Sequence, residues 1–219
     1  MFYGKIFGLA FIIIFSMAPI LVEAQPSWVL KKDKDAIRIY TRDTDKSQFK
    51  SVKVTCTIPG TLSQLTALLL DVSAHERWVY NTKSSYLVKQ PYPHQQIYYS
   101  QIDLPWPLAD REVVVFMSII QDPVTKVLHV SVDNAANDIP VKDGTVRVPA
   151  SSVKWNVTGL PGNLLSIEYY GQVDPGGSVP GWAANPFTTK GPFETFRRLR
   201  QVITSPSYAK ATFDFVVNN

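Results

Sequence analysis

The sequence has few of the residues that build metal and disulfide sites. It contains one cysteine and three histidines among 219 residues. A single cysteine excludes an intramolecular disulfide framework and a cysteine-based zinc site. His75, His94 and His129 are too far apart for the helical two-histidine metal motif. We therefore expect neither a bound metal nor a cofactor.

Charged residues are also scarce. They make up 18% of the chain, against about 25% in typical globular proteins, while 45% of the residues are hydrophobic and 12% aromatic. Such a composition excludes an intrinsically disordered chain. The net charge is +4, but lysine and arginine are scattered without a basic stripe. Nucleic-acid binding is therefore not expected.

Motifs of covalent catalysis are missing too. The chain has no nucleophile elbow, no phosphate-binding glycine loop and no zincin motif. Asp103, Asp110 and Glu112 are close in sequence, but solvation of these carboxylates at a strand end explains their presence without a catalytic role. No catalytic residues are assigned, and we do not expect an enzyme.

The longest hydrophobic run lies at the N-terminus. Lys5 precedes an apolar run of 17 residues (6–22), and Val22-Glu23-Ala24 places small residues at a cleavage site. This order is typical of a secretory signal peptide, residues 1–24. The alternative is a retained membrane anchor, but a span needs about 20 apolar residues. We expect cleavage before Gln25 and an exported protein, periplasmic or secreted.

Most of the remaining chain alternates between apolar and polar residues, as antiparallel strands with one solvated face do. Cys56 falls on the inward face of such a strand and is expected to be buried and inert. Proline- and glycine-containing turns separate the segments. The predicted strands cover residues 28–31, 36–41, 49–58, 83–89, 95–104, 111–121, 126–133, 145–158 and 163–173.

Helical spacing appears in three places. Leucines recur at helical intervals after Thr61, which is a suitable N-cap, and a second short helix is predicted over 74–80. An apolar stripe over 193–203 predicts an amphipathic helix. Residues 179–190 are a further candidate, but Pro186 and Gly191-Pro192 are expected to kink or interrupt it. Because βαβ alternation is absent, this order predicts an α+β fold with a curved antiparallel sheet around a long C-terminal helix.

Four stretches of the chain are similar to a known family. They are WVLKKDKDAIRIYTR (28–42), HERWVYN (75–81), PWPLADREVVV (105–115) and DPGGSVPGWAANPFTTKGPFETFRRLRQVI (174–203). Together they resemble the START domain, the steroidogenic-acute-regulatory-protein-related lipid-transfer family. The resemblance implies a helix-grip (START/Bet v 1-like) fold in an exported, bacterial-type member. It also implies a tunnel between the sheet and the C-terminal helix that shelters one lipid. We divide the chain into a signal peptide (1–24), a START-like domain (25–205) and a C-terminal tail (206–219).

Candidate ligand-binding residues follow from the apolar strand faces, the C-terminal helix and this resemblance. In some family members a basic tunnel residue stands six positions beyond the arginine that matches Arg111; here that position is Met117. A packed core is the alternative interpretation of the apolar strand residues. The candidates are Arg111, Met117, Val153, Trp155, Leu165, Ile167, Tyr169, Trp182, Phe193, Phe196 and Leu199.

Arg111 and Trp106 each allow two interpretations. Arg111 either forms an ion pair at the strand end that fixes a loop, or binds a phosphate or carboxylate head group with its planar fork. Trp106 lies in a Pro-Trp-Pro loop that the resemblance places near the tunnel mouth. It either contacts a membrane interface or packs the loop. Arg197, Arg198 and Arg200 lie largely off the apolar helix stripe, where they can attract anionic lipid head groups.

The expected function is binding, and possible transfer, of a hydrophobic lipid without covalent chemistry. Its partners would be a lipid or another hydrophobic small molecule and, transiently, a membrane surface. One alternative is a helix-grip enzyme of the cyclase or hydrolase type. The other is a cell-envelope interaction module with a filled core.

Overall fold

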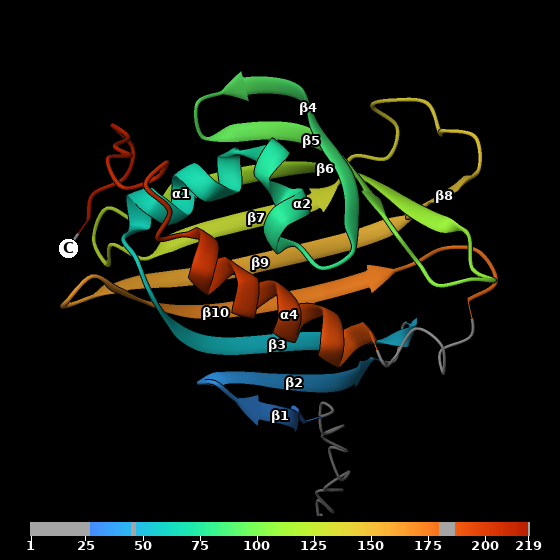
Figure 1. The fold of residues 1–219 in the computed structure, drawn as a ribbon, viewed down its shortest axis with the longest axis horizontal. Coiled ribbons are helices and arrows are strands. Elements are labelled where there is room, and N and C mark those ends of the chain that lie inside the picture. Colours follow the sequence, from blue (N-terminus) through green and yellow to red (C-terminus); the bar gives the residue numbers. More distant parts are fainter. Residues whose placement is uncertain (1–26, 45–46, 180–186, 219) are drawn as a thin grey trace, which may run out of the picture.

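A ten-stranded sheet forms the body of the protein in the computed structural model, which describes residues 27–44, 47–179 and 187–218 (Figure 1). Its order is β1-β2-β3-β10-β9-β7-β6-β5-β4 with antiparallel neighbours, and β8 pairs in parallel with β6. The strands are β1 (Val29–Lys34), β2 (Ile37–Thr44), β3 (Ser47–Pro59), β4 (Thr82–Tyr92), β5 (Gln95–Ile102), β6 (Asp110–Gln121), β7 (Leu128–Asn134), β8 (Thr145–Arg147), β9 (Ala150–Leu160) and β10 (Leu164–Asp174).

The sheet curves around the helices and is not closed, because β1 and β4 remain at opposite edges. The helices are α1 (Leu62–Leu70), the short 3₁₀ turn η1 (Val72–Ala74), α2 (His75–Trp78) and α4 (Phe187–Val202). All of them lie over one face of the sheet, with α4 across β10 and β3 (Figure 1). The predicted α+β class and the curved antiparallel sheet around a C-terminal helix are confirmed.

The first long helix begins where its sequence signal places it. The Thr61 side chain accepts a hydrogen bond from the Gln64 amide, and the Gln64 side chain accepts one from the Thr61 amide. This reciprocal capping box satisfies two amide groups that the helix leaves without intrahelical partners. The residues buried on α1 include Leu62, Leu65 and Leu68. The prediction of a helix capped by Thr61 is therefore confirmed.

The predicted strand over 145–158 is wrong in one respect, since two strands occupy this stretch. β8 ends at Arg147 and β9 begins at Ala150, with Val148 and Pro149 between them. Proline has no amide hydrogen to give to a ladder, so a strand is readily interrupted there. The Val148 amide donates to the Glu112 carbonyl, so this residue is still hydrogen-bonded to β6 just before the chain enters β9.

The C-terminal helix is longer than its apolar stripe predicts. It begins at Phe187, six residues before Phe193, and it contains Pro192. Gly191-Pro192 therefore do not interrupt it. A proline in the second turn removes one main-chain hydrogen bond of the helix. Burial of Phe193, Phe196 and Leu199 against the sheet, together with Phe187 at the cavity described below, compensates for that loss.

The core beneath α4 is aromatic. Phe196 packs against Trp155 of β9 and Tyr169 of β10, with ring centroids 5.1 and 5.4 Å apart. The Trp155 and Tyr169 rings meet edge to face at 5.3 Å. Such contacts contribute beyond the area they bury. This cluster fixes the middle of the helix to the sheet.

Cys56 is buried in β3, as its place in the alternation predicts. Desolvation raises the pKa of its thiol to about 12. The side chain therefore stays protonated near neutral pH and fills space in the core as a small apolar group.

The segment after α4 packs back on the domain. Tyr208 and Val216 are buried in the hydrophobic core, and the Tyr208 hydroxyl donates to Asp71. The Asn218 side chain accepts from the Ser63 amide at the start of α1. The described part of the predicted tail thus covers the end of the sheet on which α1 lies. The predicted signal peptide and Trp182 lie outside the described residues. No helix within the described ranges is long and apolar enough to cross a membrane.

His75 is a buried histidine held in its neutral form. Its Nε2 donates to the Leu69 carbonyl at 3.1 Å, and its ring meets Trp78 and Tyr98 edge to face. Burial lowers the pKa of His75 to about 4 from an ordinary value of 6.5. In the unfolded chain the same side chain takes up a proton below about pH 6.5.

We expect this histidine to make the protein less stable in weak acid. Because its folded-state pKa is depressed, the stabilisation is complete above the unfolded pKa and is lost as the pH falls towards about 4. Between pH 6.5 and 5 the loss is roughly 2 kcal/mol. Urea unfolding of the wild type and of His75→Gln at several pH values measures it. An equal loss in both proteins would contradict the assignment.

Candidate functional site

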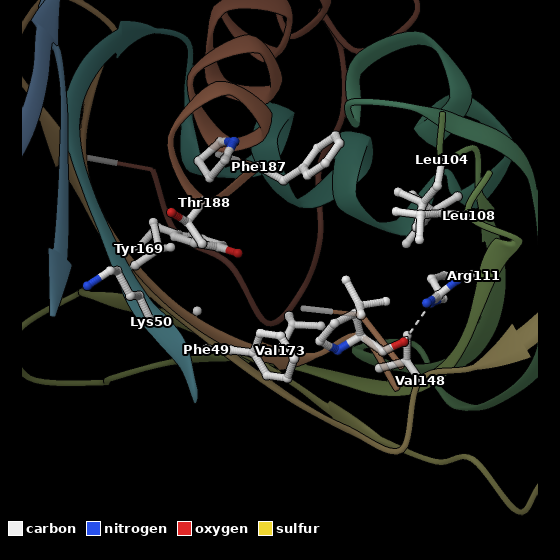
Figure 2. Close-up of a pocket in the computed structure, with 16 residues that line it drawn as sticks. Phe49, Lys50, Leu104, Leu108, Arg111, Val148, Tyr169, Val173, Phe187 and Thr188 are labelled. Atoms are coloured by element: carbon white, nitrogen blue, oxygen red, sulfur yellow. Dashed lines mark hydrogen bonds between the residues drawn. The ribbon is translucent and has the colours of Figure 1, made fainter. Parts of the chain in front are cut away.

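A cavity of about 230 Å³ lies between the sheet and the N-terminal half of α4 (Figure 2). β3 and β10 form its sheet side. The first turns of α4 and the loop between β5 and β6 contribute to the opposite side. Among the described residues the lining consists of Phe49, Lys50, Val52, Ile102, Leu104, Leu108, Arg111, Val148, Tyr169, Gly171, Val173, Pro175, Val179, Phe187, Thr188 and Pro192.

The lining is mainly aliphatic and aromatic, with few polar groups. Tyr169 and Thr188 bring hydroxyls, and Lys50 and Arg111 are its only charged residues within the described ranges. Lys50 forms an ion pair with Asp43 of β2, which is not part of the lining. A mostly apolar cavity with a few polar groups is the usual form of a site for a small hydrophobic molecule.

Gly171 makes room for Tyr169 along the cavity wall. Residues two positions apart on a strand point to the same face, so a side chain at 171 would meet the ring. A Cβ atom built on Gly171 would lie 2.6 Å from the Tyr169 hydroxyl oxygen. Burial raises the pKa of Tyr169 to about 12, so the hydroxyl keeps its proton and can donate a hydrogen bond.

Arg111 is a buried cation at the cavity. Its residue is 5% exposed, and Nε donates to the Pro175 carbonyl at 2.7 Å. Its terminal nitrogens donate to the carbonyls of Ala109 and, at 3.2 Å, of Gly176. Desolvation lowers the pKa of Arg111. These bonds join the start of β6 to the loop that follows β10.

The acids beside Arg111 in the sequence bind other cations. Asp110 pairs with Lys83 at 3.0 Å, and Glu112 pairs with Arg147 at 2.8 Å. Successive strand residues point to opposite faces, which separates both carboxylates from the arginine between them. The expected strand-end ion pair of Arg111 is therefore not formed among the described residues. The loop is fixed through carbonyl groups instead.

The loop held by Arg111 depends on glycine. Gly176 has φ +66°, in the left-handed region that glycine adopts without strain. A Cβ atom at Gly176 would also lie 2.8 Å from Pro149 Cδ and 3.0 Å from the Arg147 carbonyl oxygen. Gly176 and Gly177 thus allow the loop after β10 to pass close to β8. In this position the Gly176 carbonyl accepts a hydrogen bond from Arg111.

Trp106 is on the surface of a loop whose neighbours line the cavity. It is 92% exposed, while Leu104 and Leu108 on either side face the cavity. Packing within the loop therefore does not explain the presence of a tryptophan at this position. An exposed tryptophan beside an apolar cavity resembles the interfacial anchors of membrane-associated proteins.

The comparisons with known proteins agree with this architecture. The START domain family model matches residues 21–207. The chain belongs to the START domain family. A STAR-related lipid transfer protein from Xanthomonas axonopodis is 25% identical, with a TM-score of 0.75 over 81% of this chain and 99% of that one. An uncharacterised protein of Pseudomonas aeruginosa is 29% identical over 79% of this chain and 85% of its own length.

A more distant START structure shares the fold alone. Human StAR-related lipid transfer protein 5 has a TM-score of 0.69 at 12% identity, covering 80% of this chain and 86% of that one. The helix-grip fold predicted from the sequence resemblance is thus confirmed. The arrangement of sheet and C-terminal helix persists although nearly all side chains differ.

The structure places only some of the sequence-predicted ligand residues of this START domain at the cavity. Arg111 and Tyr169 line the cavity. Val153 packs against the core, outside the described lining, and Trp182 is outside the described residues. The remaining candidates are buried in the core cluster and are not in the lining: Met117, Trp155, Leu165, Ile167, Phe193, Phe196 and Leu199.

The cavity and the packed core lie at different positions along the strands. Met117 lies six residues beyond Arg111 on β6, about 20 Å away along an extended strand. The Phe196 cluster fills the space beneath the middle of α4. The cavity lies at the end of the sheet where β10 ends and α4 begins (Figure 2).

The helix arginines are engaged with neighbours. Arg197 pairs with Glu194 at 2.7 Å, and Arg200 donates to the Asp35 carbonyl at 2.6 Å. The Arg198 guanidinium lies 5.8 Å from the centre of the Tyr80 ring. They start five residues beyond Pro192, the last residue of α4 in the described lining, or about 7.5 Å along the helix. Their predicted membrane contact stays a prediction.

Several lining residues were missed because strand alternation does not reveal where a sheet lacks a covering helix. Val52 reads as an ordinary inward residue of β3, and Val148 as part of a longer strand. Phe49 is three positions before Val52, so the alternation places it on the opposite face. Leu104 and Leu108 flank the Pro-Trp-Pro sequence. Two leucines in a proline-rich loop were the signal that could have placed this loop over an apolar site.

Proposed function

We propose that this START domain binds a hydrophobic lipid in the cavity beneath the N-terminal half of α4 and transfers it between membranes. The observation that carries the proposal is the apolar lining formed by β3, β10, α4 and the loop around Trp106. Burial of apolar surface supplies the binding energy, at about 25 cal/mol per Å². No covalent step is part of this function.

The size of the cavity sets a condition on lipid uptake. Pockets for small organic ligands usually measure about 300–1,000 Å³, so a cavity of about 230 Å³ is small for a long-chain lipid. A long chain requires displacement of the elements that cover the cavity. We assign this movement to the first turns of α4 and to residues 103–109, both of which line the cavity on the side away from the sheet.

Trp106 is the proposed membrane anchor. Its exposed indole adjoins Leu104 and Leu108, so insertion at a bilayer surface would bring the apolar cavity next to the lipid chains. Arg197, Arg198 and Arg200 would add attraction to anionic head groups where their own contacts loosen. An exported protein, cleaved before Gln25, would use this surface in a periplasmic or external compartment.

We expect Trp106→Ser to slow lipid transfer and to preserve lipid binding. Loss of about 1.4 kcal/mol of interfacial affinity corresponds to roughly tenfold slower transfer. The measurement is exchange of a fluorescent lipid between donor and acceptor vesicles, with binding measured in parallel. Val124→Ser, at the exposed turn between β6 and β7, is the matched control. Wild-type protein that transfers no lipid at all would refute the proposed function.

A further inference from the structure

The charged residues in the described lining of the cavity are both cations. Its described lining contains Arg111 and Lys50 and no carboxylate. We infer, on the basis of the proposed function, that the bound lipid has an anionic head group, either a carboxylate or a phosphate. Arg111 binds this head group, and the hydrocarbon chain occupies the apolar cavity.

Arg111 has no charge partner in the described part of the chain. Its three hydrogen bonds go to main-chain carbonyls, which are dipoles and leave a full positive charge buried. Neither adjacent acid forms an ion pair with it, since Asp110 binds Lys83 and Glu112 binds Arg147. A buried charge without a counterion is costly, and an anionic ligand removes that cost.

The guanidinium also retains donor capacity. It carries five N–H groups, and three are used by the carbonyls of Pro175, Ala109 and Gly176. One N–H on each terminal nitrogen has no acceptor among the described residues. These two N–H groups can donate to the oxygens of a carboxylate or phosphate. The carbonyl bonds fix the side chain in place, so binding would require little reorganisation of the arginine.

Lys50 contributes to the same preference from β3. Its ammonium pairs with Asp43, so it is partly neutralised, but the cavity itself presents no acid to a ligand. A cationic head would meet two cations without a carboxylate. A neutral head would leave Arg111 unpaired. The arrangement therefore favours an anionic amphiphile.

The test compares ligands that differ only in the head. A neutral fluorescent probe, N-phenylnaphthylamine, is displaced from the full chain by dodecanoic acid, dodecyl phosphate, dodecanol and dodecyltrimethylammonium, at a pH where the acid is ionised. We expect the two anions to bind about tenfold more tightly than dodecanol, and the cation more weakly. The better of the two anions identifies the head group. Equal affinity for dodecanol and both anions would overturn the inference.

Substitutions test whether Arg111 causes the preference for anionic ligands. Arg111→Met is expected to lose the preference for anions, measured within the variant as the ratio of its affinities for the anions and for dodecanol. Arg38→Met, an exposed arginine on β2, should retain it. A preference that survives in folded Arg111→Met contradicts the assignment. If that variant does not fold, the ligand series on the wild type decides. Probe binding without any anion preference would refute this inference alone, whereas failure of every ligand and the probe to bind would refute the proposed function.

Discussion

Replacement of Glu112 by alanine is expected to lower the free energy of unfolding by about 3–5 kcal/mol, the usual cost of removing one partner of a buried ion pair. The Glu112 carboxylate is fully buried and lies 2.8 Å from Arg147. It also accepts the Lys142 amide at 3.2 Å. Without it, Arg147 remains as a buried and unpaired cation.

This ion pair organises the segment before β9. Arg147 donates to the carbonyls of Ile139, at 3.2 Å, and Pro140, at 3.0 Å, so the chain from 136 to 142 wraps around the guanidinium. The residue after Arg147, Val148, lines the cavity, and its amide donates to the main-chain carbonyl of Glu112, a bond that alanine retains. Because Glu112→Ala frees the Arg147 side chain next to Val148, we expect it to loosen one cavity wall as well as to destabilise the fold.

Denaturant unfolding of a double-mutant cycle measures the pair. Glu112→Leu and Arg147→Met are expected to be costly singly, and the double variant should be more stable than the sum of the two losses predicts. Arg38→Met with Asp33→Leu, an exposed pair, is the control and should change stability by less than about 1 kcal/mol. Additive losses at Glu112 and Arg147 would contradict the assigned coupling.

Replacement of Val173 by tryptophan is expected to weaken lipid binding by roughly 60-fold. Val173 is 42% exposed, lies on β10 and lines the cavity. An indole at this position takes space within a cavity of about 230 Å³ that the chain would otherwise occupy. A lipid that loses about 100 Å² of apolar contact loses roughly 2.5 kcal/mol, which gives this factor.

Val124→Trp controls for an added tryptophan, since Val124 is 86% exposed at the turn between β6 and β7. We expect it to bind lipid like the wild type. Thermal unfolding of both variants separates lost binding from lost folding. Normal lipid affinity in a folded Val173→Trp protein would show that the ligand binds outside this cavity.

Much of the fold was predictable because its local signals agree. The alternation in β10 and β7 places Leu165, Ile167 and Leu128 inside, and all three are buried. Thr61 and Gln64 mark the start of α1 through a local capping box. The START resemblance supplied the arrangement of these elements, and the family match confirms it.

The site was less predictable than the fold, because a cavity forms where side chains leave the space between the sheet and the helix unfilled. Trp155, Phe196 and Tyr169 have the same apolar character, yet Tyr169 lines the cavity and the other two fill the core. The difference lies in where α4 begins and in the absence of a side chain at Gly171. Neither follows from strand periodicity.

Ion pairs between residues far apart in the chain could not be predicted from the sequence either. Glu112 and Arg147 are separated by 35 positions, and no spacing rule connects them. Arg111 was recognised as a candidate through its planar guanidinium, but two of its three carbonyl partners belong to a loop 64 and 65 residues away. Only the tertiary fold shows that both adjacent acids are committed to other cations.

Native mass spectrometry of the purified chain, expressed in cells and kept free of detergent, tests the central claim most directly. We predict a mass shift equal to one bound lipid on the wild type, lost after extraction with organic solvent and largely missing from Val173→Trp. Wild-type protein that is consistently free of lipid, and stays so after incubation with lipid vesicles, would contradict the account.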